Sequence, residues 1–123
     1  MARILVVDDS ETFREIIKEI LISEGHAIVG EAANGSEGVQ RYKELSPDIT
    51  TMDITMPVMN GIEALRAIIE FDPKAKVIMV SSSAQNRKIA ESIIMGAYGF
   101  LAKPFDQEKV AKFICEIATS ADE

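Results

Sequence analysis

The 123-residue sequence has no tryptophan, a single histidine and a single cysteine, Cys115. One thiol cannot form an internal disulfide, so we expect the chain to fold in a reducing compartment. No apolar run is long enough to span a bilayer, and no apolar segment of the signal-peptide kind follows Met1. These absences predict a cytoplasmic protein that does not use a membrane.

Positively charged residues are fewer than negatively charged ones. The chain has 13 lysines and arginines and 20 aspartates and glutamates, which gives a net charge of −7. A protein that binds nucleic acid or anionic lipid needs a basic face, so the composition argues against both as the main partner. The length fits one domain with an ordinary core. We therefore expect a single, monomeric domain that spans residues 1–123.

Five short apolar segments alternate with five segments whose apolar residues recur at helical spacing. The predicted strands are 4–7, 27–33, 49–53, 76–80 and 98–102. The predicted helices are 11–23, 37–45, 62–71, 86–95 and 107–117, with Ser36 and Asp106 as N-caps of the second and fifth. Strict alternation predicts an α/β fold, in which a doubly wound parallel sheet has helices on both faces.

Charged and hydroxyl side chains follow four of these strands. Asp8 and Asp9 follow the first strand, Asp53 ends the third, Ser81 follows the fourth, and Lys103 follows the fifth. The carboxyl ends of parallel strands share one edge of the sheet, and ligands bind there where the strand order reverses, which we expect between the first and third strands. The sequence therefore predicts three carboxylates, a hydroxyl and an ammonium in one crevice.

Three neighbouring carboxylates repel one another unless a cation neutralises them. Oxygen ligands suit Mg²⁺, with Mn²⁺ as a substitute, and the backbone carbonyl of Thr55 would complete the set. With the metal bound, one carboxylate can still act as a nucleophile. The metal and Lys103 together can then offset charge on a transferred phosphoryl group, and Ser81 can donate a hydrogen bond to it.

Each signal is weak by itself. Adjacent aspartates after a strand are usually a helix cap and first-turn charge, and serines at 81–83 are usually turn residues. Their conjunction at four strand ends carries the prediction. We also expect a cis bond between Lys103 and Pro104, a surface position for His26, and simple packing roles for Met52, Met56, Met59, Met79 and Met95.

In these motifs the chain resembles the response-regulator receiver domains of two-component signalling, and among them the single-domain chemotaxis regulators. The motifs are Val6-Val7-Asp8-Asp9-Ser10, Met52-Asp53-Ile54-Thr55-Met56-Pro57-Val58-Met59-Asn60-Gly61, Ser81-Ser82 and Lys103-Pro104-Phe105. The resemblance covers essentially the whole chain. It implies a flavodoxin-like (βα)5 sandwich with strand order 2-1-3-4-5 and no output domain.

The resemblance also implies the roles of these residues. Asp53 would be the phosphoacceptor, and it would hold the metal together with Asp8, Asp9 and the Thr55 carbonyl. Ser81 would be the switch hydroxyl, Lys103 the phosphate-pairing cation and Phe100 the aromatic switch. The implied partners are a histidine kinase, a downstream target such as a flagellar motor switch protein, and a phosphatase. Output would occur by protein contact through the fourth helix, fifth strand and fifth helix. Such a protein accepts a phosphoryl group and is not a turnover enzyme.

Some residues depart from the family pattern. Thr50 and Thr51 place hydroxyls in a strand that is usually more apolar, and Phe100 lacks the hydroxyl of a tyrosine. Thr55 and Ser83 offer neither a carboxylate nor an amide to orient an attacking water. We therefore expect slow self-dephosphorylation.

Other functions stay open. Within the family, the chain could be a phosphorelay carrier or a regulator in a kinase network. A phosphatase of the haloacid dehalogenase type also uses a strand-end aspartate with Mg²⁺, but it needs a second carboxylate where this chain has Thr55. A flavodoxin-like flavin binder would need Ser, Thr or Gly where this chain has Asp8 and Asp9.

Overall fold

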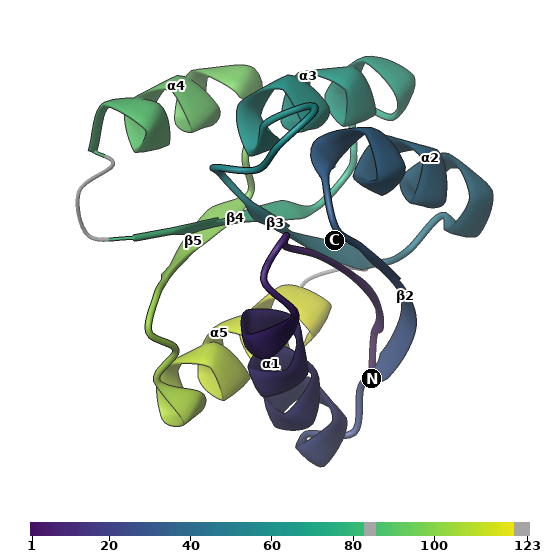
Figure 1. Cartoon of the computed structure of the whole chain (residues 1–123). Helices are drawn as coiled ribbons and strands as arrows, with labels where there is room; N and C mark the ends of the chain where they lie inside the picture. Colours follow the sequence, from purple (N-terminus) through teal and green to yellow (C-terminus); the bar gives the residue numbers. More distant parts are fainter. Residues whose placement is uncertain (83–85, 120–123) are drawn as a thin grey trace.

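A five-stranded parallel sheet with helices on both faces forms the centre of the computed structural model, which describes residues 1–82 and 86–119 (Figure 1). The elements are β1 (Arg3–Val7), α1 (Glu11–Ser23), β2 (Ala27–Ala32), α2 (Gly35–Leu45), β3 (Ile49–Asp53), α3 (Gly61–Phe71), β4 (Val77–Ser81), α4 (Asn86–Met95), β5 (Gly99–Ala102) and α5 (Gln107–Thr119). The predicted bounds agree to within two residues. The strand order β2-β1-β3-β4-β5 confirms the predicted topology and the reversal beside β1.

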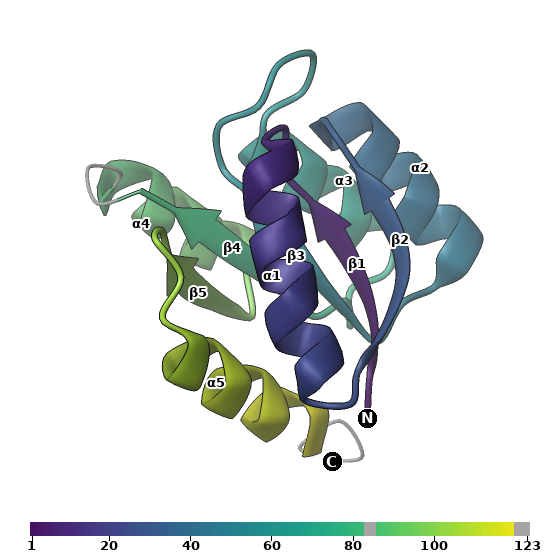
Figure 2. The same cartoon turned by 60° about the horizontal axis from the view of Figure 1, so that its bottom comes forward.

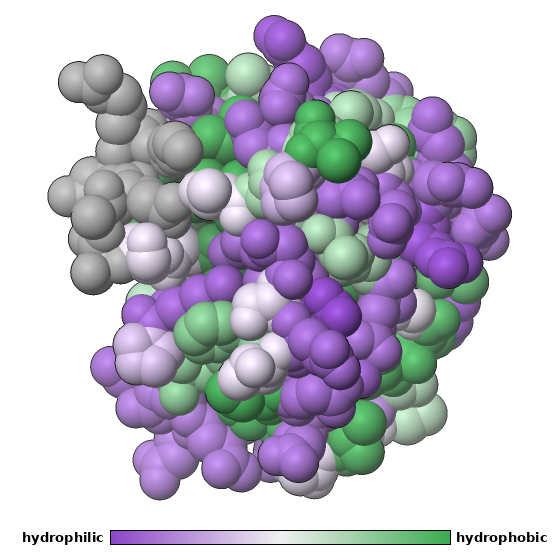
Figure 3. All heavy atoms as spheres, viewed as in Figure 1, coloured by the Kyte–Doolittle hydropathy of each residue, from purple (hydrophilic) through white to green (hydrophobic). Residues whose placement is uncertain are grey.

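Each face of the sheet has its own hydrophobic core, because successive side chains of a strand point to opposite faces. Ile4 and Val6 of β1 belong to the core beneath α1 and α5. Leu5 and Val7 belong to the core beneath α2, α3 and α4. Figure 2 shows α1 and α5 together on one side of the sheet. Figure 3, in the orientation of Figure 1, shows a mostly hydrophilic surface with scattered hydrophobic residues. Strands covered on both faces explain the continuous apolar runs in the sequence.

The predicted N-cap of α5 is confirmed, and the predicted N-cap of α2 is wrong. Asp106 Oδ1 accepts a hydrogen bond from the Lys109 N–H at 3.1 Å, as predicted for α5. The N-cap of α2 is Asn34 and not Ser36, because Asn34 Oδ1 accepts from the Glu37 N–H at 2.9 Å. Asparagine caps a helix as well as serine does, so the helix begins two residues earlier.

Apolar spacing misplaces two isoleucines. Helical spacing in the sequence predicts Ile93 on the inner face of α4 and Ile16 on that of α1, but Ile93 is 59% exposed and Ile16 is 39% exposed. On α4, Ile89 packs against the core, as the same spacing predicts, and Ser92 is fully buried on the inward side. The inward stripe therefore follows Ile89 and Ser92, three residues apart, which turns Ile93 to the surface.

His26 is buried, so its predicted surface position is wrong. Its Nδ1 accepts a hydrogen bond from the Ala2 N–H at 3.0 Å, next to β1. Burial, with the nearby amino terminus, lowers the pKa of His26 below its usual value. A neutral imidazole thus satisfies a backbone donor that would otherwise be unpaired.

The methionines have the packing roles that the sequence predicts. Met52, Met56 and Met79 lie in the core beneath α2, α3 and α4, and Met59 and Met95 pack against it. Within the described part of the chain, no helix is both long enough and apolar enough to span a membrane.

Candidate functional site

The three aspartates meet at the carboxyl edge of the sheet. β1 pairs with β3 so that Val7 lies opposite Met52, and the next residues, Asp8 and Asp53, are therefore neighbours. One carboxylate oxygen from each of Asp8, Asp9 and Asp53 lies within 4.8 Å of the others. Asp8 and Asp53 are buried, whereas Asp9 is exposed. The crevice is thus open to solvent at Asp9 and closed at Asp8 and Asp53.

Lys103 reaches into the same crevice from the end of β5. Its Nζ lies 2.8 Å from Asp8 Oδ2 and 3.2 Å from Asp53 Oδ1. The Lys103 N–H donates to the carbonyl of Ser81 at 2.9 Å, and the peptide bond to Pro104 is cis, as expected. Burial lowers the pKa of Lys103, but the hydrogen bonds and charges of Asp8 and Asp53 outweigh this effect and raise it.

The cluster carries more negative charge than Lys103 can balance. Burial and the charge of Asp8 raise the pKa of Asp53 from 3.8 to about 6, although Lys103 acts in the opposite direction. A hard divalent cation prefers such a set of carboxylate oxygens and would remove the repulsion. The three aspartates therefore fit a divalent metal site.

Arg14 supports Asp8 from the first turns of α1. Its Nη1 donates to the backbone carbonyl of Asp8 at 2.6 Å, and its Nε pairs with Glu31 at 3.1 Å. The Asp8 Oδ1 accepts from the Ser10 N–H at 2.9 Å. The sequence analysis did not identify Arg14, although a helix that starts directly after two aspartates must place its first turns beside them.

Phe13 contacts Lys103 directly. The Lys103 Nζ lies 4.1 Å from the centroid of the Phe13 ring, and Phe105 meets that ring edge-on at 5.9 Å. Helical spacing in the sequence predicts only that Phe13 belongs to the apolar stripe of α1. Its contact with the ammonium depends on how α1 lies against the end of β5, and no sequence pattern reports that.

The other residues of the predicted site lie around this centre. Ser81 is buried at the end of β4, where the preceding residue, Val80, pairs with Asp53. Thr55 is exposed two residues beyond Asp53. Phe100 is half-buried and packs against the core beneath α2, α3 and α4. Ser83 lies outside the described residues.

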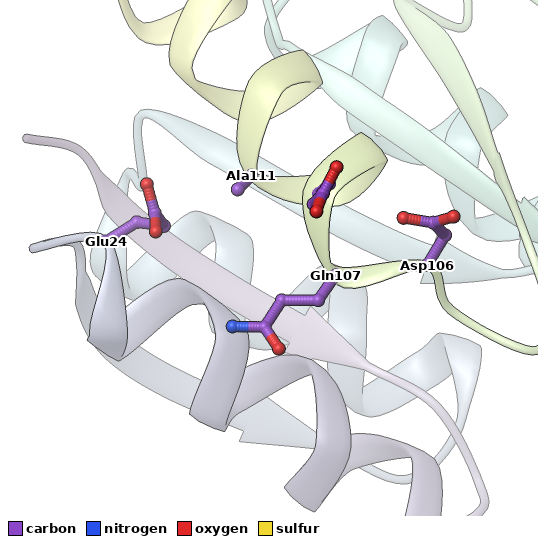
Figure 4. A pocket seen from close by; sticks show the side chains of 5 residues that line it. Glu24, Asp106, Gln107 and Ala111 are labelled. Carbon is purple, nitrogen blue, oxygen red and sulfur yellow. The ribbon is translucent and has the colours of Figure 1, made fainter.

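A separate hollow of about 600 Å³ lies between the end of α1 and the start of α5 (Figure 4). Its lining residues are Glu24, Asp106, Gln107, Glu108 and Ala111. Since the aspartate cluster lies at the opposite end of α1, this hollow does not belong to it.

Comparisons with known proteins agree with this geometry. Residues 4–114 match the family model described as the response regulator receiver domain. The chain is 50% identical over 117 residues to the protein CcdB of Bacillus subtilis, which covers 95% of this chain and 98% of that protein. It is 45% identical over 116 residues to the chemotaxis protein CheY of Thermotoga maritima, which covers 94% of this chain and 97% of that protein.

Among solved structures, the chain is similar to a crystal structure of a CheX-CheY-BeF3-Mg²⁺ complex from Borrelia burgdorferi. The TM-score is 0.89 at 40% identity, and the match covers 94% of this chain and 88% of that one. The family match spans most of the chain, and both sequence relatives match over nearly their full lengths. This protein therefore belongs to the response regulator receiver domain family and is a phosphoacceptor.

Proposed function

We propose that Asp53 accepts a phosphoryl group from the phosphohistidine of a histidine kinase, and that the protein thereby works as a single-domain chemotaxis regulator. The observation that carries this proposal is the position of the Lys103 ammonium, 2.8 Å from Asp8 and 3.2 Å from Asp53. This arrangement supplies a buried carboxylate as nucleophile and a fixed positive charge beside it.

The transfer exchanges one bond to phosphorus for another. A carboxylate oxygen of Asp53 forms a bond to phosphorus, while the bond between phosphorus and the partner's imidazole nitrogen breaks. Lys103 balances negative charge on the phosphoryl oxygens. Mg²⁺, or Mn²⁺ in its place, would be held by Asp8, Asp9, Asp53 and the Thr55 carbonyl, and it would neutralise further charge on those oxygens.

Phosphorylation then acts as a charge switch. Asp53 gains negative charge, which attracts the Lys103 ammonium and the Ser81 hydroxyl. Lys103 and Ser81 are already joined through their backbones, so their movement acts on the adjoining ends of β4 and β5. Phe100 on β5 would turn inward under packing forces, because it has no hydroxyl, and the α4–β5–α5 surface would change.

The energy of this switch is attainable. A shift from mostly inactive to mostly active needs roughly 5 kcal/mol of differential interaction. Charge-assisted hydrogen bonds contribute about 1.5 to 3 kcal/mol each. Two or three such bonds from Lys103 and Ser81 to the phosphoryl group would suffice.

The relatives support a target in chemotaxis. Several proteins similar to this chain at 43–46% identity are named chemotaxis protein CheY, which favours a flagellar motor switch protein as the target. The structure of a CheX-CheY complex supports a further protein partner, which we propose to be a phosphatase. We propose that the protein acts as a cytoplasmic monomer. The relative named CcdB keeps a second candidate open, a phosphorelay carrier or kinase-network regulator.

Mass measurement after incubation with a small phosphodonor and Mg²⁺ tests the site. We expect wild-type protein and the control Asp106→Asn to gain one phosphoryl group each, and Asp53→Asn to gain none. A phosphoryl group on Asp53→Asn would overturn the assignment. Binding of phosphorylated protein to a motor switch peptide, as opposed to transfer onward to a phosphotransfer histidine, then separates the two candidate functions.

A further inference from the structure

We propose that Phe13 is a positioning residue for Lys103, whose ammonium it holds between Asp8 and Asp53 by a cation–π contact. This inference rests on the proposed function, because it concerns the residue that balances phosphoryl charge. The Lys103 Nζ lies over the Phe13 ring, 4.1 Å from its centroid. A cation at this distance is attracted by the negative face of the ring.

The ring itself is held by the segments that carry the charged groups. The Phe13 N–H donates to the N-cap oxygen of Ser10 at 3.3 Å, and the Ser10 N–H donates to Asp8 at 2.9 Å. Phe105, two residues after Lys103, packs its ring edge-on against Phe13 with an interplanar angle of 83°. Phe13 is therefore fixed relative to both members of the Lys103–Asp8 ion pair.

Lys103 needs such a contact because its ammonium is a compact charge on a flexible four-carbon stem. Its ion pairs with Asp8 and Asp53 change whenever those carboxylates change charge. The Phe13 ring is neutral, so its attraction for the ammonium persists through each of these changes. The ring thus keeps the ammonium within reach of Asp53 while the charges around it vary.

Proton NMR of the metal-free protein tests the contact without any phosphorylation. In wild type, we expect the ring current of Phe13 to shift the ε-methylene protons of Lys103 upfield. Phe13→Tyr should keep this shift, and Phe13→Leu, which fills similar space without a ring, should lose it. The matched control is Phe71→Leu, which removes the ring beneath Lys43 Nζ and beside Tyr42, and it should change the signals of Lys43 and Tyr42 but not those of Lys103. Unchanged Lys103 signals in a folded Phe13→Leu protein would overturn the proposal.

The rate of Asp53 phosphorylation from a small phosphodonor tests the consequence. We expect Phe13→Leu to slow it on the order of 3- to 10-fold, with Phe13→Tyr and Phe71→Leu near wild type. In a Lys103→Met background, Phe13→Leu should cause no further loss. An equal loss in both backgrounds would show that the ring acts through packing alone. If the wild-type protein is not phosphorylated at all, the proposed function fails, and the NMR result still decides the contact.

Discussion

Asp53 is the residue on which burial and like charge act most strongly in this crevice. The residue is 7% exposed, and its carboxylate lies among Asp8, Asp9 and Lys103. Burial, with the charge of Asp8, raises its pKa to about 6. The metal-free fold is therefore destabilised by its own site at neutral pH, a cost that an acidic functional site imposes on stability.

We expect Asp53→Asn to stabilise the metal-free protein at pH 7 by on the order of 2 kcal/mol. The folded pKa, about 6, lies above the value of 3.8 for an unperturbed group, so folding takes up a proton between these values. The contribution of Asp53 to the free energy of unfolding should thus be greatest below pH 4 and should fall as the pH rises through 6. Asp53→Asn should lack this pH dependence. Urea unfolding of the two proteins between pH 4 and pH 7 measures both the stability difference and its pH dependence. A lower stability of Asp53→Asn at pH 7 would contradict the prediction; Asp106→Asn is the control.

Thr50 is a second residue whose buried polar group lowers the stability of the fold. It is fully buried in β3, and its Oγ1 is the one buried side-chain oxygen or nitrogen without a hydrogen-bond partner among the described residues. We expect Thr50→Val, which has nearly the same shape, to raise the free energy of unfolding by about 1 kcal/mol. Urea titration measures this change, with Thr12→Val on the surface of α1 as a control near zero. A loss of stability in Thr50→Val would mean that the hydroxyl has a partner.

At the scale of elements, α1 connects the two charged sides of the crevice. Its residue Arg14 donates to the carbonyl of Asp8, and its residue Phe13 lies beneath the ammonium of Lys103. Helical periodicity identifies α1 and its buried Ile17, Ile20 and Leu21. It does not show which residue meets β5, because that depends on the position of α1 relative to a strand almost 90 residues away in the sequence.

The loop between β3 and α3 stores backbone strain beside the site. Val58 has φ of 68°, a region that a β-branched residue rarely adopts, and the Met59 N–H donates to Pro57 O across it at 2.7 Å. We expect Val58→Asn to raise the free energy of unfolding by about 1 kcal/mol, because asparagine tolerates this conformation. Val58→Ala also removes the β-branch but lacks the side-chain amide that favours positive φ in asparagine, so it should gain less. Equal effects of the two substitutions in thermal unfolding would contradict the argument.

At the scale of the whole molecule, the acidic cluster exists only when the sheet has formed. Its carboxylates come from the ends of β1 and β3, and Lys103 comes from the end of β5 at the edge of the sheet. A divalent ion that binds this cluster therefore binds the folded chain in preference to the unfolded one. Metal affinity and folding stability are linked in this protein.

We expect Mg²⁺ at 100 times its dissociation constant to stabilise the protein by about 2.7 kcal/mol, measured as a rise in the thermal midpoint. Asp9→Asn removes the negative charge of one proposed ligand at an exposed position, so it should weaken the rise without disturbing the core. Asp106→Asn should keep the full rise, and KCl at equal ionic strength separates binding from screening. An undiminished rise in Asp9→Asn would exclude Asp9 as a ligand.

The sequence by itself determined the order of the elements, the parallel sheet and the edge at which Asp8, Asp53 and Lys103 meet. These features depend on local periodicity and on a topology that alternating strands and helices nearly force. Only the tertiary structure decided that the ring of Phe13 lies beneath Lys103 and that His26 is buried, with its Nδ1 accepting from Ala2. Each of these contacts joins residues far apart along the chain, so each depends on how packed elements lie against one another.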